Sequence, residues 1–455
     1  MKLTIIGGAG VRTPFMIAGL AHYAPRIDLQ EVWLMDIDAE KLDIIGGLCQ
    51  SLATQHDVPF TLHLTTDPRE ALRDADHVIT TIRVGGEMGR VQDERIALRR
   101  GAIGQETTGP GGFAMAMRSI PAILDYCELI DQIAPRAWVH NFTNPAGLVT
   151  QALRDVGFAR IIGICDSANI AQHHVASYLG VAADAVETEV FGLNHLSWTR
   201  AARVNGQDRL PELLKDPTFI DTCHMYLFDA ALREYFGMFL NEYLYYYYYR
   251  DEMLAKLQGG EETRGEEVAR LTQDLLRQLR ALDNVEDRLR VHGDIMAARS
   301  ATYIGHAEKP VAQAAPHDNQ ASQPDQAAHA LGYAGVTLEC IEAIQTGTAH
   351  RTGLNVPNAG AIAGMCDDDV VEVTCLVDAN GPHPVPIGEI PESQYLLTRT
   401  VKRYERLAAQ AILKRDRTLA VEALFEHPLV GSFSLAKALV DDYITAHREY
   451  LGKWE

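Results

Sequence analysis

Short apolar runs alternate with helical stretches along the first third of the chain, and this alternation sets the expected fold. Five runs have the length and composition of buried strands, at residues 3–8, 31–36, 77–82, 136–141 and 160–165. Helical patterns separate them, most clearly over 14–23 and 114–134. Strands that alternate with helices at this spacing are typical of a doubly wound parallel sheet. We therefore predict an α/β fold for this part of the chain.

After residue 165 the pattern changes from strand–helix alternation to longer blocks. The expected elements are antiparallel strands around an Asn-His turn at 186–203, helices over 224–290, a polar, aperiodic loop at 311–332, a strand at 369–378 and a helical tail at 394–451. Mixed blocks of this kind are typical of an α+β arrangement. We expect a first domain over residues 1–170 and an α+β catalytic and oligomerisation domain over 171–455.

Charge and composition exclude several classes of partner. The chain has 455 residues, with 41 basic and 61 acidic side chains and a net charge of −20. Such a surface repels nucleic acid and anionic lipid, and no apolar run is long enough to span a membrane. The start of the chain has the pattern of a strand and not of a signal peptide. Seven scattered cysteines with no CxxC pair suit a reducing compartment, so we expect a cytoplasmic protein.

A glycine-rich turn follows the first predicted strand and precedes the first helix. It contains Gly7, Gly8, Gly10 and Thr13, and Asp36 closes the second strand. Glycines let a backbone approach a pyrophosphate, and an acid at the end of the second strand can bind the ribose hydroxyls of NAD. The alternative is a plain strand–helix turn without a nucleotide. The order of these features along the chain (strand, glycines, helix, second strand and acid) favours a Rossmann-type, NAD-binding domain.

Two dense polar stretches follow later strands of the predicted sheet. The first holds Arg83, Arg90 and Arg95 and continues through the glycine-rich segment 104–112, and the second covers 141–145. Ligands bind at the carboxyl edge of a parallel sheet. A simple turn does not require arginines and carboxylates, so these charged side chains favour a binding site. Simple turn formation is the competing interpretation, because Gly, Asn and Pro favour turns.

Three further residue types could carry chemistry near the nicotinamide of a bound NAD. Cys165 ends a predicted strand, and His195 lies in the Asn-His turn 30 residues later. A buried Cys or His is usually structural, but two such ligands would leave a metal open to substrate oxygens. A run of tyrosines spans 243–249. Most of these rings must pack in the core, but one could act as a general base.

Taken together, these segments resemble glycoside hydrolase family 4, and within it the 6-phospho-β-glucosidases. The segments that carry the resemblance are Gly7–Pro14, Ile82–Gly86, Asp93–Gly112 with its GQETTGPGG stretch, Asn141–Gly147, Gly163–Asp166, Gly192–His195, Leu354–Asn358, Val370–Cys375, His427–Val430 and Ala446–Leu451. The resemblance spans nearly the whole chain. It implies a core like that of lactate and malate dehydrogenases.

The resemblance implies a mechanism that is unusual among glycosidases. NAD⁺ takes a hydride from C3 of the sugar, and a divalent metal, usually Mn²⁺, binds the C2 and C3 oxygens. The C3 ketone acidifies the C2 proton, a tyrosine removes that proton, and the C1–O bond breaks by elimination. Water then adds and the hydride returns. The physical logic is that carbonyl and metal stabilise charge where it develops.

Carried over by position, the resemblance assigns roles to individual residues. Cys165 and His195 are the implied metal ligands, and Asn144 and Asn194 contact substrate or metal-bound oxygens. Arg83, which the nucleotide site shares, lines the sugar or phosphate region with Arg90 and Arg95. The implied base is Tyr243, with Tyr235 as the fallback, and Asp166 is a second catalytic residue.

The sequence departs from the β-glucosidase pattern at two places. Position 166 is Asp, where phospho-β-glucosidases typically have Asn and phospho-α-glucosidases Asp. The segment that begins at Arg299 has Ser-Ala-Thr where the family usually has Gly-Gly-Ala. Cleavage of α-linked or unphosphorylated sugars is therefore an open alternative. Two further functions stay open as alternatives. One is a malate- or lactate-type dehydrogenase, and the other is a non-catalytic sensor of a sugar phosphate or NAD. The family implies a homodimer or homotetramer.

Overall fold

The computed structural model describes residues 1–301 and 326–455, with side chains from residue 334 onward in the second range. Within these residues the larger sheet has nine strands in the order β13-β12-β11-β6-β5-β4-β1-β2-β3. Its strands are β1 (Lys2–Ile6), β2 (Glu31–Met35), β3 (Thr61–Thr65), β4 (His77–Thr80), β5 (Trp138–Asn141), β6 (Ile161–Gly163), β11 (His350–Pro357), β12 (Val370–Asp378) and β13 (Gly381–Pro384).

The first six strands are parallel and follow the order of a dinucleotide-binding fold. From β6 to β3 the order is 6-5-4-1-2-3, and every neighbouring pair is parallel. This is the strand order of the Rossmann fold, whose ligands bind at the carboxyl edge where the order reverses. The reversal lies between β1 and β4. The predicted Rossmann-type sheet is therefore confirmed.

The apolar pattern does not predict β3, which forms the outer edge of this sheet. Its residues 61–65 alternate polar and apolar, and they are only partly buried. An edge strand with one covered face lacks the continuous apolar run of the buried strands, so its signal is weaker. The sequence pattern therefore predicts five strands in this part of the chain and misses the sixth, β3.

The C-terminal half extends the same sheet. β11 joins β6 antiparallel through Asn355 and Gly163, and β12 and β13 continue beyond it. The sheet therefore crosses the expected boundary at residue 170, and the division into 1–170 and 171–455 stays a prediction. The expected strand at 369–378 is confirmed as β12.

A second, smaller sheet carries the Asn-His turn. It consists of β7 (Val186–Leu193), β8 (Leu196–Val204), β9 (Gln207–Asp208) and β10 (Phe239–Leu240). β7 and β8 form an antiparallel hairpin, as the pattern over 186–203 predicts. β12 packs against β7, so the two sheets are in direct contact.

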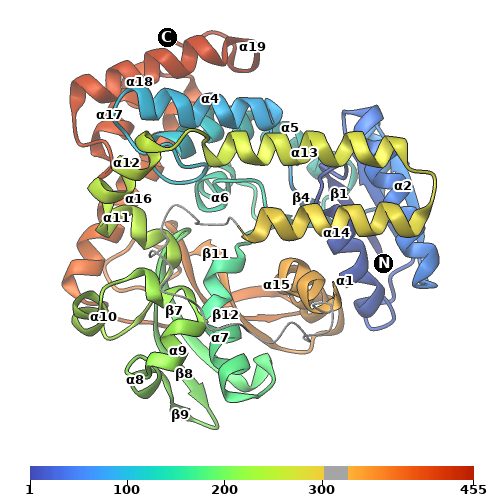
Figure 1. Cartoon of the computed structure of the whole chain (residues 1–455), viewed down its shortest axis with the longest axis horizontal. Coiled ribbons are helices and arrows are strands. Elements are labelled where there is room, and N and C mark those ends of the chain that lie inside the picture. The colour runs from blue at the N-terminus through green and yellow to red at the C-terminus, as the bar shows by residue number, and fades with distance from the viewer. Residues whose placement is uncertain (302–325) are drawn as a thin grey trace.

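Helices cover both faces of the large sheet (Figure 1). Those of the first half are α1 (Thr13–Tyr23), α2 (Ala39–Gln55), α3 (Pro68–Leu72), α4 (Gly86–Arg99), α5 (Gly109–Ile133), α6 (Ala146–Asp155) and α7 (Ile170–Leu179). The later ones are α8 (Leu210–Leu213), α9 (Pro217–Thr222), α10 (Ala230–Phe236), α11 (Tyr245–Tyr248), α12 (Arg250–Gly259), α13 (Arg264–Ala281), α14 (Val285–Ala301), α15 (Gln326–Thr346), α16 (Glu392–Lys414), α17 (Arg417–Glu426), α18 (Phe433–Ala446) and α19 (Arg448–Leu451). Short 3₁₀ turns cover Asp166–Asn169, Ala183–Ala185, His224–Leu227 and Glu242–Leu244.

The expected loop at 311–332 is only partly testable. Its residues 311–325 lie outside the described residues, and 326–332 belong to helix α15. That part of the prediction was wrong, because alanine and glutamine are good helix formers even without a clear periodicity. None of the described helices combines the length and apolar character that a membrane span requires.

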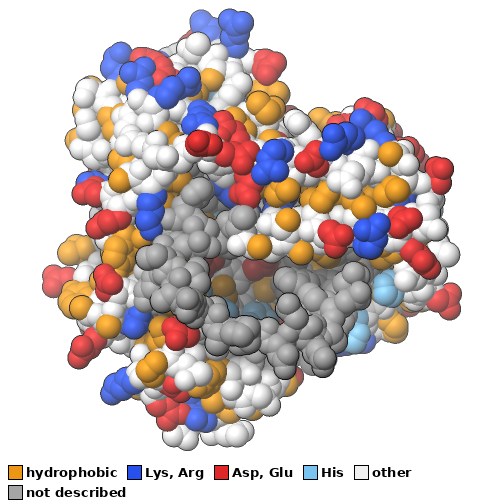
Figure 2. Space-filling model, in the orientation of Figure 1, with side chains coloured by type: hydrophobic (Ala, Val, Ile, Leu, Met, Phe, Trp, Pro, Cys, Tyr) orange, Lys and Arg blue, Asp and Glu red, His pale blue; other side chains and the backbone are white. Residues whose placement is uncertain are grey.

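Two long helices, α13 and α14, lie side by side across the edge of the Rossmann part (Figure 1). A capping box starts α13: the Thr263 hydroxyl accepts from the Glu266 backbone N–H, and the Glu266 carboxylate accepts from that of Thr263. The outer surface of both helices carries acidic and basic side chains intermixed (Figure 2). Their inner residues join the core formed by β1, β2, α1 and α2.

Candidate active site

Two glycines bring the turn after β1 against its neighbours. Gly7 has a φ of +91°, and a Cβ there would lie 2.5 Å from the carbonyl oxygen of Thr81. A Cβ on Gly8 would come within 2.8 Å of the Leu34 side chain. Neither position can hold a side chain, so the backbone runs tightly into the start of α1. That helix N-terminus is where this fold binds a pyrophosphate.

Asp36 follows β2 and is hydrogen bonded to the nucleotide turn. One of its carboxylate oxygens accepts from the backbone N–H of Ala9 at 3.0 Å, and the other from that of Asp38 at 3.1 Å. In the same turn the Thr13 N–H donates to the Gly10 carbonyl at 2.9 Å as α1 begins. Asp36 therefore occupies the position from which an acid binds the ribose hydroxyls of NAD.

His195 occupies the tip of the two-residue turn between β7 and β8. Its backbone φ is +60°, a left-handed value that few residues other than glycine adopt. The side chain is buried, and burial lowers the pKa of the imidazole to about 3 even though the charge of Glu106 acts in the opposite direction. The ring is therefore neutral at physiological pH, which is the form that binds a metal.

A short hydrogen-bond chain fixes which nitrogen of His195 carries the proton. The Gln105 side-chain oxygen accepts from the backbone N–H groups of Thr107 and Thr108, and it also accepts from the Thr107 hydroxyl at 2.8 Å. The Thr107 hydroxyl proton is thus committed to Gln105. The hydroxyl oxygen lies 2.5 Å from Nδ1 of His195 and must accept from it. Nε2 of His195 consequently keeps its lone pair free for a cation.

Tyr243 lies directly against His195. The two rings are parallel within 2°, and their centroids are 3.7 Å apart. Tyr243 is held at the start of a 3₁₀ turn, where its backbone N–H donates to the Asn241 side chain at 3.0 Å. Tyr235, the fallback base, is 68% exposed on α10 and packs on Phe236. The structure therefore brings Tyr243, and not Tyr235, to the predicted metal ligand.

Cys165 lies two residues beyond β6, at the carboxyl edge of the sheet. The thiol is buried, and burial raises its pKa well above the usual value, with further contributions from the charges of Glu372 and Asp166. A thiol in such an acidic environment stays protonated unless a cation is nearby. A metal would reverse this effect, because a coordinating thiol loses its proton.

Glu372, on β12, connects the surroundings of Cys165 with the turn that holds His195. Its buried carboxylate accepts from Ser197 Oγ at 2.7 Å, from Asn355 Nδ2 at 3.1 Å and from Asn194 Nδ2 at 3.3 Å. Asn194 directly precedes His195, and Glu372 is close enough to Cys165 for its charge to raise the thiol pKa. Glu372 therefore lies near Cys165 and also binds the residue that precedes His195.

The donor set fits a divalent cation. His195 offers a neutral nitrogen, Cys165 a thiol, and the buried Oδ1 of Asp166 and Oε2 of Glu242 have no hydrogen-bond partner within the described part of the chain. Ser167, which follows Asp166, donates to the other oxygen of Glu242 at 2.7 Å, and Glu242 directly precedes Tyr243, so these oxygens belong to the same neighbourhood. Among the described residues no group of three or more His, Cys, Asp or Glu side chains is arranged to hold a metal ion. A cation held by two protein ligands would keep positions open for substrate oxygens.

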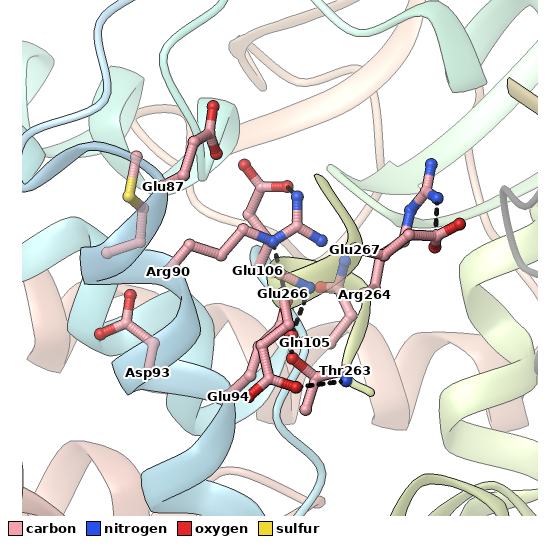
Figure 3. A network of polar contacts seen from close by, with 12 residues as sticks. Glu87, Arg90, Asp93, Glu94, Gln105, Glu106, Thr263, Arg264, Glu266 and Glu267 are labelled. Atoms are coloured by element: carbon pink, nitrogen blue, oxygen red, sulfur yellow. Dashed lines mark hydrogen bonds and ion pairs between the residues drawn. The ribbon is translucent and has the colours of Figure 1, made fainter. Parts of the chain in front are cut away.

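Arginines and glutamates form a buried network beside this site (Figure 3). Glu106 bridges Arg83 at 2.5 Å and Arg90 at 2.7 Å, and Arg90 also pairs with Glu94 at 2.7 Å. Burial alone would raise the pKa of Glu106, but the two guanidinium groups hold it well below its usual value. Glu87 pairs with Arg83 at 3.4 Å. Arg83 and Arg90 are thus fixed and charged at the edge of the sheet.

Two further arginines add positive charge to this network. Arg299, near the end of α14, is buried, and burial together with the charges of Arg12, Arg83 and Arg90 lowers its pKa to about 9, although the charge of Glu87 acts in the opposite direction. Arg12 comes from the nucleotide turn. A buried guanidinium that faces other cations is stabilised when an anion joins them. The cluster of Arg12, Arg83, Arg90 and Arg299, called the arginine cluster below, is therefore a candidate anion site.

The remaining predicted residues differ in how the structure places them. Arg95 does not join the arginine cluster: it pairs with Glu266 of α13 at 2.7 Å, so its role in substrate binding stays a prediction. Asn194 accepts from the Gly147 backbone N–H at 3.4 Å and thereby joins its turn to α6. Asn144 is partly buried in the loop before α6, after β5.

Sequence reasoning missed several residues that organise the site. Thr107 and Gln105 lie in the glycine-rich polar stretch 104–112, but His195, the partner of Thr107, is 88 residues away in the sequence, so their role could not be inferred. Glu372 did leave a signal, because it is a charged residue inside the otherwise apolar strand Val370–Asp378. An acid in a fully buried strand needs partners, which marks it as a candidate for a polar network.

Comparison with known proteins agrees with this geometry. The sequence profile "Family 4 glycosyl hydrolase" matches residues 2–181, and "Family 4 glycosyl hydrolase C-terminal domain" matches residues 190–430. A 6-phospho-beta-glucosidase of Escherichia coli (strain K12) is 33% identical over 99% of this chain and 96% of its own length.

Solved structures show the same likeness. The 6-phospho-beta glucosidase from Thermotoga maritima, with manganese, NAD⁺ and glucose-6-phosphate, has a TM-score of 0.83 at 28% identity and 99% coverage of both chains. A 6-phospho-alpha-glucosidase from gut microorganisms, in complex with NAD and Mn²⁺, has a TM-score of 0.82 at 28% identity and covers 100% and 99%. A malate dehydrogenase from Plasmodium falciparum, at 13% identity and a TM-score of 0.51, shares the fold alone.

Proposed function

The chain belongs to glycosyl hydrolase family 4, and we propose that it cleaves 6-phospho-β-glucosides with the help of NAD⁺ and a divalent metal, Mn²⁺ by preference. The observation that carries the proposal is the state of His195. Its Nδ1 proton is fixed by Thr107, its Nε2 is free for a cation, and Tyr243 lies parallel to its ring.

In the mechanism that family membership implies, bound NAD⁺ would supply the hydride acceptor and donor for C3, and a bound metal would stabilise negative charge on the sugar. Tyr243 takes the proton from C2, because it is the tyrosine that lies at the predicted metal ligand. Cys165 and His195 hold the metal, and Glu372 orients the Asn194–His195 turn. Gly7, Gly8, Gly10, Thr13 and Asp36 bind the cofactor.

The arginine cluster supports a phosphorylated substrate. Arg83 and Arg90 pair with Glu106, and the charges of Arg83 and Arg90 also reach Arg299. A dianionic phosphate on C6 would interact favourably with these guanidinium groups, and a neutral sugar would not. The protein as a whole carries a charge of −20, so an anionic substrate needs such a local excess of cations.

Paired substrates test this proposal. Initial rates are measured on aryl β-glucosides with and without a 6-phosphate, using enzyme dialysed against EDTA and then supplied with Mn²⁺ and NAD⁺ separately and together. We expect cleavage of the phosphorylated substrate only when both are present, with no net formation of NADH. Full activity after EDTA treatment without added metal would refute the role of the metal. Equal rates on both substrates would refute a preference for the 6-phosphate.

Asp166 supports a second candidate, cleavage of 6-phospho-α-glucosides. Burial raises the pKa of this carboxyl to about 7, with Glu242 adding to the effect and Arg12 opposing it. A carboxyl that is still partly protonated at neutral pH can donate a proton to a leaving oxygen. Rates on the matched α- and β-linked 6-phosphoglucosides distinguish the two candidates directly.

We also propose a cytoplasmic location and a homodimeric or homotetrameric assembly. Each of the seven cysteines is free, which suits a reducing compartment. The assembly follows from family membership and is tested by the mass in solution.

A further inference from the structure

The segment that carries Tyr243 has little regular structure to hold it in place. It follows the two-residue strand β10 and forms the short 3₁₀ turn Glu242–Leu244. Asn241 caps this turn, because its side-chain oxygen accepts from the Tyr243 backbone N–H at 3.0 Å. A single short turn makes few backbone hydrogen bonds of its own. Contacts with neighbouring elements therefore decide where the Tyr243 side chain lies.

Asn241 connects the turn to the hairpin that carries His195. Its backbone N–H donates to the Ser197 carbonyl at 3.2 Å, and its side-chain Nδ2 donates to Ser197 Oγ, also at 3.2 Å. Ser197 lies on β8, two residues after His195, and its hydroxyl donates to Glu372 at 2.7 Å. Asn241 and Ser197 are both buried. One end of the turn is thus held by the strand that begins next to His195.

Glu242 connects the same turn to the segment that carries Cys165. Its buried carboxylate accepts from Ser167 Oγ at 2.7 Å, although the two residues are 75 positions apart in the sequence. Ser167 lies two residues after Cys165, in the 3₁₀ turn Asp166–Asn169. Burial of a carboxylate is costly, and a hydrogen bond in the core offsets part of that cost. Tyr243 is therefore preceded by two residues, each bonded to the segment of one predicted metal ligand.

We propose that Glu242 is a positioning residue for Tyr243: its hydrogen bond from Ser167 fixes the turn against the Cys165 segment. The proposal rests on the proposed function, because it takes Tyr243 as the base. A turn held only through Asn241 could rotate about that contact, and the second hydrogen bond prevents this rotation. A base must lie within hydrogen-bond reach of the proton that it removes, and a displacement of about 1 Å can lower the rate by about 10²-fold.

Removal of this hydrogen bond tests the proposal at saturating substrate, Mn²⁺ and NAD⁺. Ser167→Ala removes the donor and keeps the carboxylate, and we expect kcat to fall by about 10-fold or more. Glu242→Leu removes the acceptor and should have a similar effect, whereas Glu242→Gln keeps an acceptor for Ser167 and should restore most of the rate. Ser177→Ala, at an exposed position of α7, is the matched control and should show the native rate.

A Tyr243→Phe background separates positioning from a merely structural role. If Glu242 acts through the phenol, loss of its hydrogen bond costs little once the phenol is gone, so Ser167→Ala should lower kcat by less than about twofold in this background. A structural role would lower kcat by the same factor in both backgrounds, and that result would overturn the proposal. A loss in Glu242→Gln as large as in Glu242→Leu would also overturn it, because the charge and not the hydrogen bond would then matter.

A fluorine label reports the position of the ring independently of catalysis. 3-Fluorotyrosine is placed at position 243 alone, and its ¹⁹F resonance is recorded with NAD⁺ but without Mn²⁺, whose unpaired electrons would broaden the signal. The imidazole of His195, stacked on this ring, should displace the resonance from that of an exposed fluorotyrosine. Ser167→Ala and Glu242→Leu should move or split the resonance, and Ser177→Ala should not. An unchanged resonance in the first two variants would contradict the proposal.

The outcomes distinguish this proposal from the proposed function. A native kcat in Tyr243→Phe would show that another group is the base, and the positioning role would fall with it. A large loss in Tyr243→Phe together with native rates in Ser167→Ala and Glu242→Leu would overturn the positioning role alone. If Glu242→Leu does not fold, Ser167→Ala, which removes a single oxygen atom, serves for both measurements.

Discussion

Tyr243 stacks face to face on His195, with the ring centroids 3.7 Å apart and the planes within 2°. This contact joins the tyrosine-rich segment 243–249 to the Asn194–His195 turn of the small sheet. It places the phenol ring against the imidazole whose Nε2 is free for a cation. A cation at this position would favour the ionised phenol, which is the state that a general base requires.

Removal of the Tyr243 hydroxyl should therefore affect chemistry and leave binding intact. Tyr243→Phe keeps the ring against His195, and we expect kcat to fall by about 10²- to 10⁴-fold, the usual contribution of a general base. Dissociation constants for NAD⁺ and Mn²⁺ should change little. Tyr235→Phe is the control, because that side chain is 68% exposed and should show the native rate. A native kcat in Tyr243→Phe would show that another group is the base.

The hydrogen bond from His195 to Thr107 should matter for the metal. Thr107→Val has nearly the same shape but no acceptor for the Nδ1 proton, so the tautomer that leaves Nε2 free is no longer favoured. Loss of such an outer partner typically weakens metal binding by about 10- to 100-fold. Titration of Mn²⁺ followed by electron paramagnetic resonance measures the change. Thr107→Ser should bind Mn²⁺ as the native protein does, and equal affinity in Thr107→Val would refute the assigned tautomer.

Arg299 should contribute to the preference for a phosphorylated substrate. In Arg299→Gln the extra buried charge is lost, and a charge-assisted hydrogen bond of about 2 kcal/mol corresponds to roughly a thirtyfold lower kcat/KM on the 6-phosphoglucoside. The rate on the unphosphorylated glucoside should not fall in parallel. Arg277→Gln, on the exposed side of α13, serves as the control. A parallel loss on both substrates would assign Arg299 to the fold and not to the phosphate.

The buried pair His77 and His140 predicts how stability depends on pH. Nδ1 of His77 lies 3.0 Å from Nε2 of His140, and burial lowers the pKa of His77 to about 4 and that of His140 well below its usual value. Between about pH 6.5 and pH 4 the unfolded chain binds protons that the folded protein does not. Stability is therefore independent of this pair above pH 6.5 and is lost as the pH falls, by about 1.4 kcal/mol per pH unit for each histidine.

Urea denaturation at several pH values tests this expectation. In His77→Asn the free energy of unfolding should fall less steeply with decreasing pH than in the native protein. The difference in slope should be about 1.4 kcal/mol per pH unit, which corresponds to one proton fewer taken up on unfolding. Both proteins are compared without metal or cofactor, so that ligand binding adds no slope of its own. Identical slopes would mean that His77 is protonated in the folded state or exposed before unfolding.

Local sequence patterns predict those parts of the molecule in which neighbouring residues determine the structure. Gly7, Gly8 and Asp36 lie where the strand–turn–helix pattern expects them, and the Asn194–His195 turn closes a hairpin as its flanking apolar strands require. β3 escapes prediction, because an edge strand needs only one apolar face. The pairing of β11 with β6 depends on residues that are nearly 200 positions apart.

The finer organisation of the site depends on contacts that no local pattern encodes. Thr107 fixes the tautomer of His195, and Glu372 connects the Asn194 turn to the surroundings of Cys165. Arg95 shows that a candidate residue can have another partner. It lies in the polar stretch that suggests a substrate site, but its guanidinium pairs with Glu266 of α13. Residue type and spacing thus identify the candidates, and the fold decides which of them meet.

Cleavage in deuterium oxide tests the central claim most directly, namely that a proton is removed from C2 of the sugar beside a metal held by Cys165 and His195. The 6-phosphoglucoside is hydrolysed in D₂O with Mn²⁺ and NAD⁺, and the released glucose 6-phosphate is analysed by proton NMR. We predict deuterium at C2 of the product and no accumulation of NADH. A product that keeps all of its C2 hydrogen while cleavage proceeds at the full rate would contradict the account.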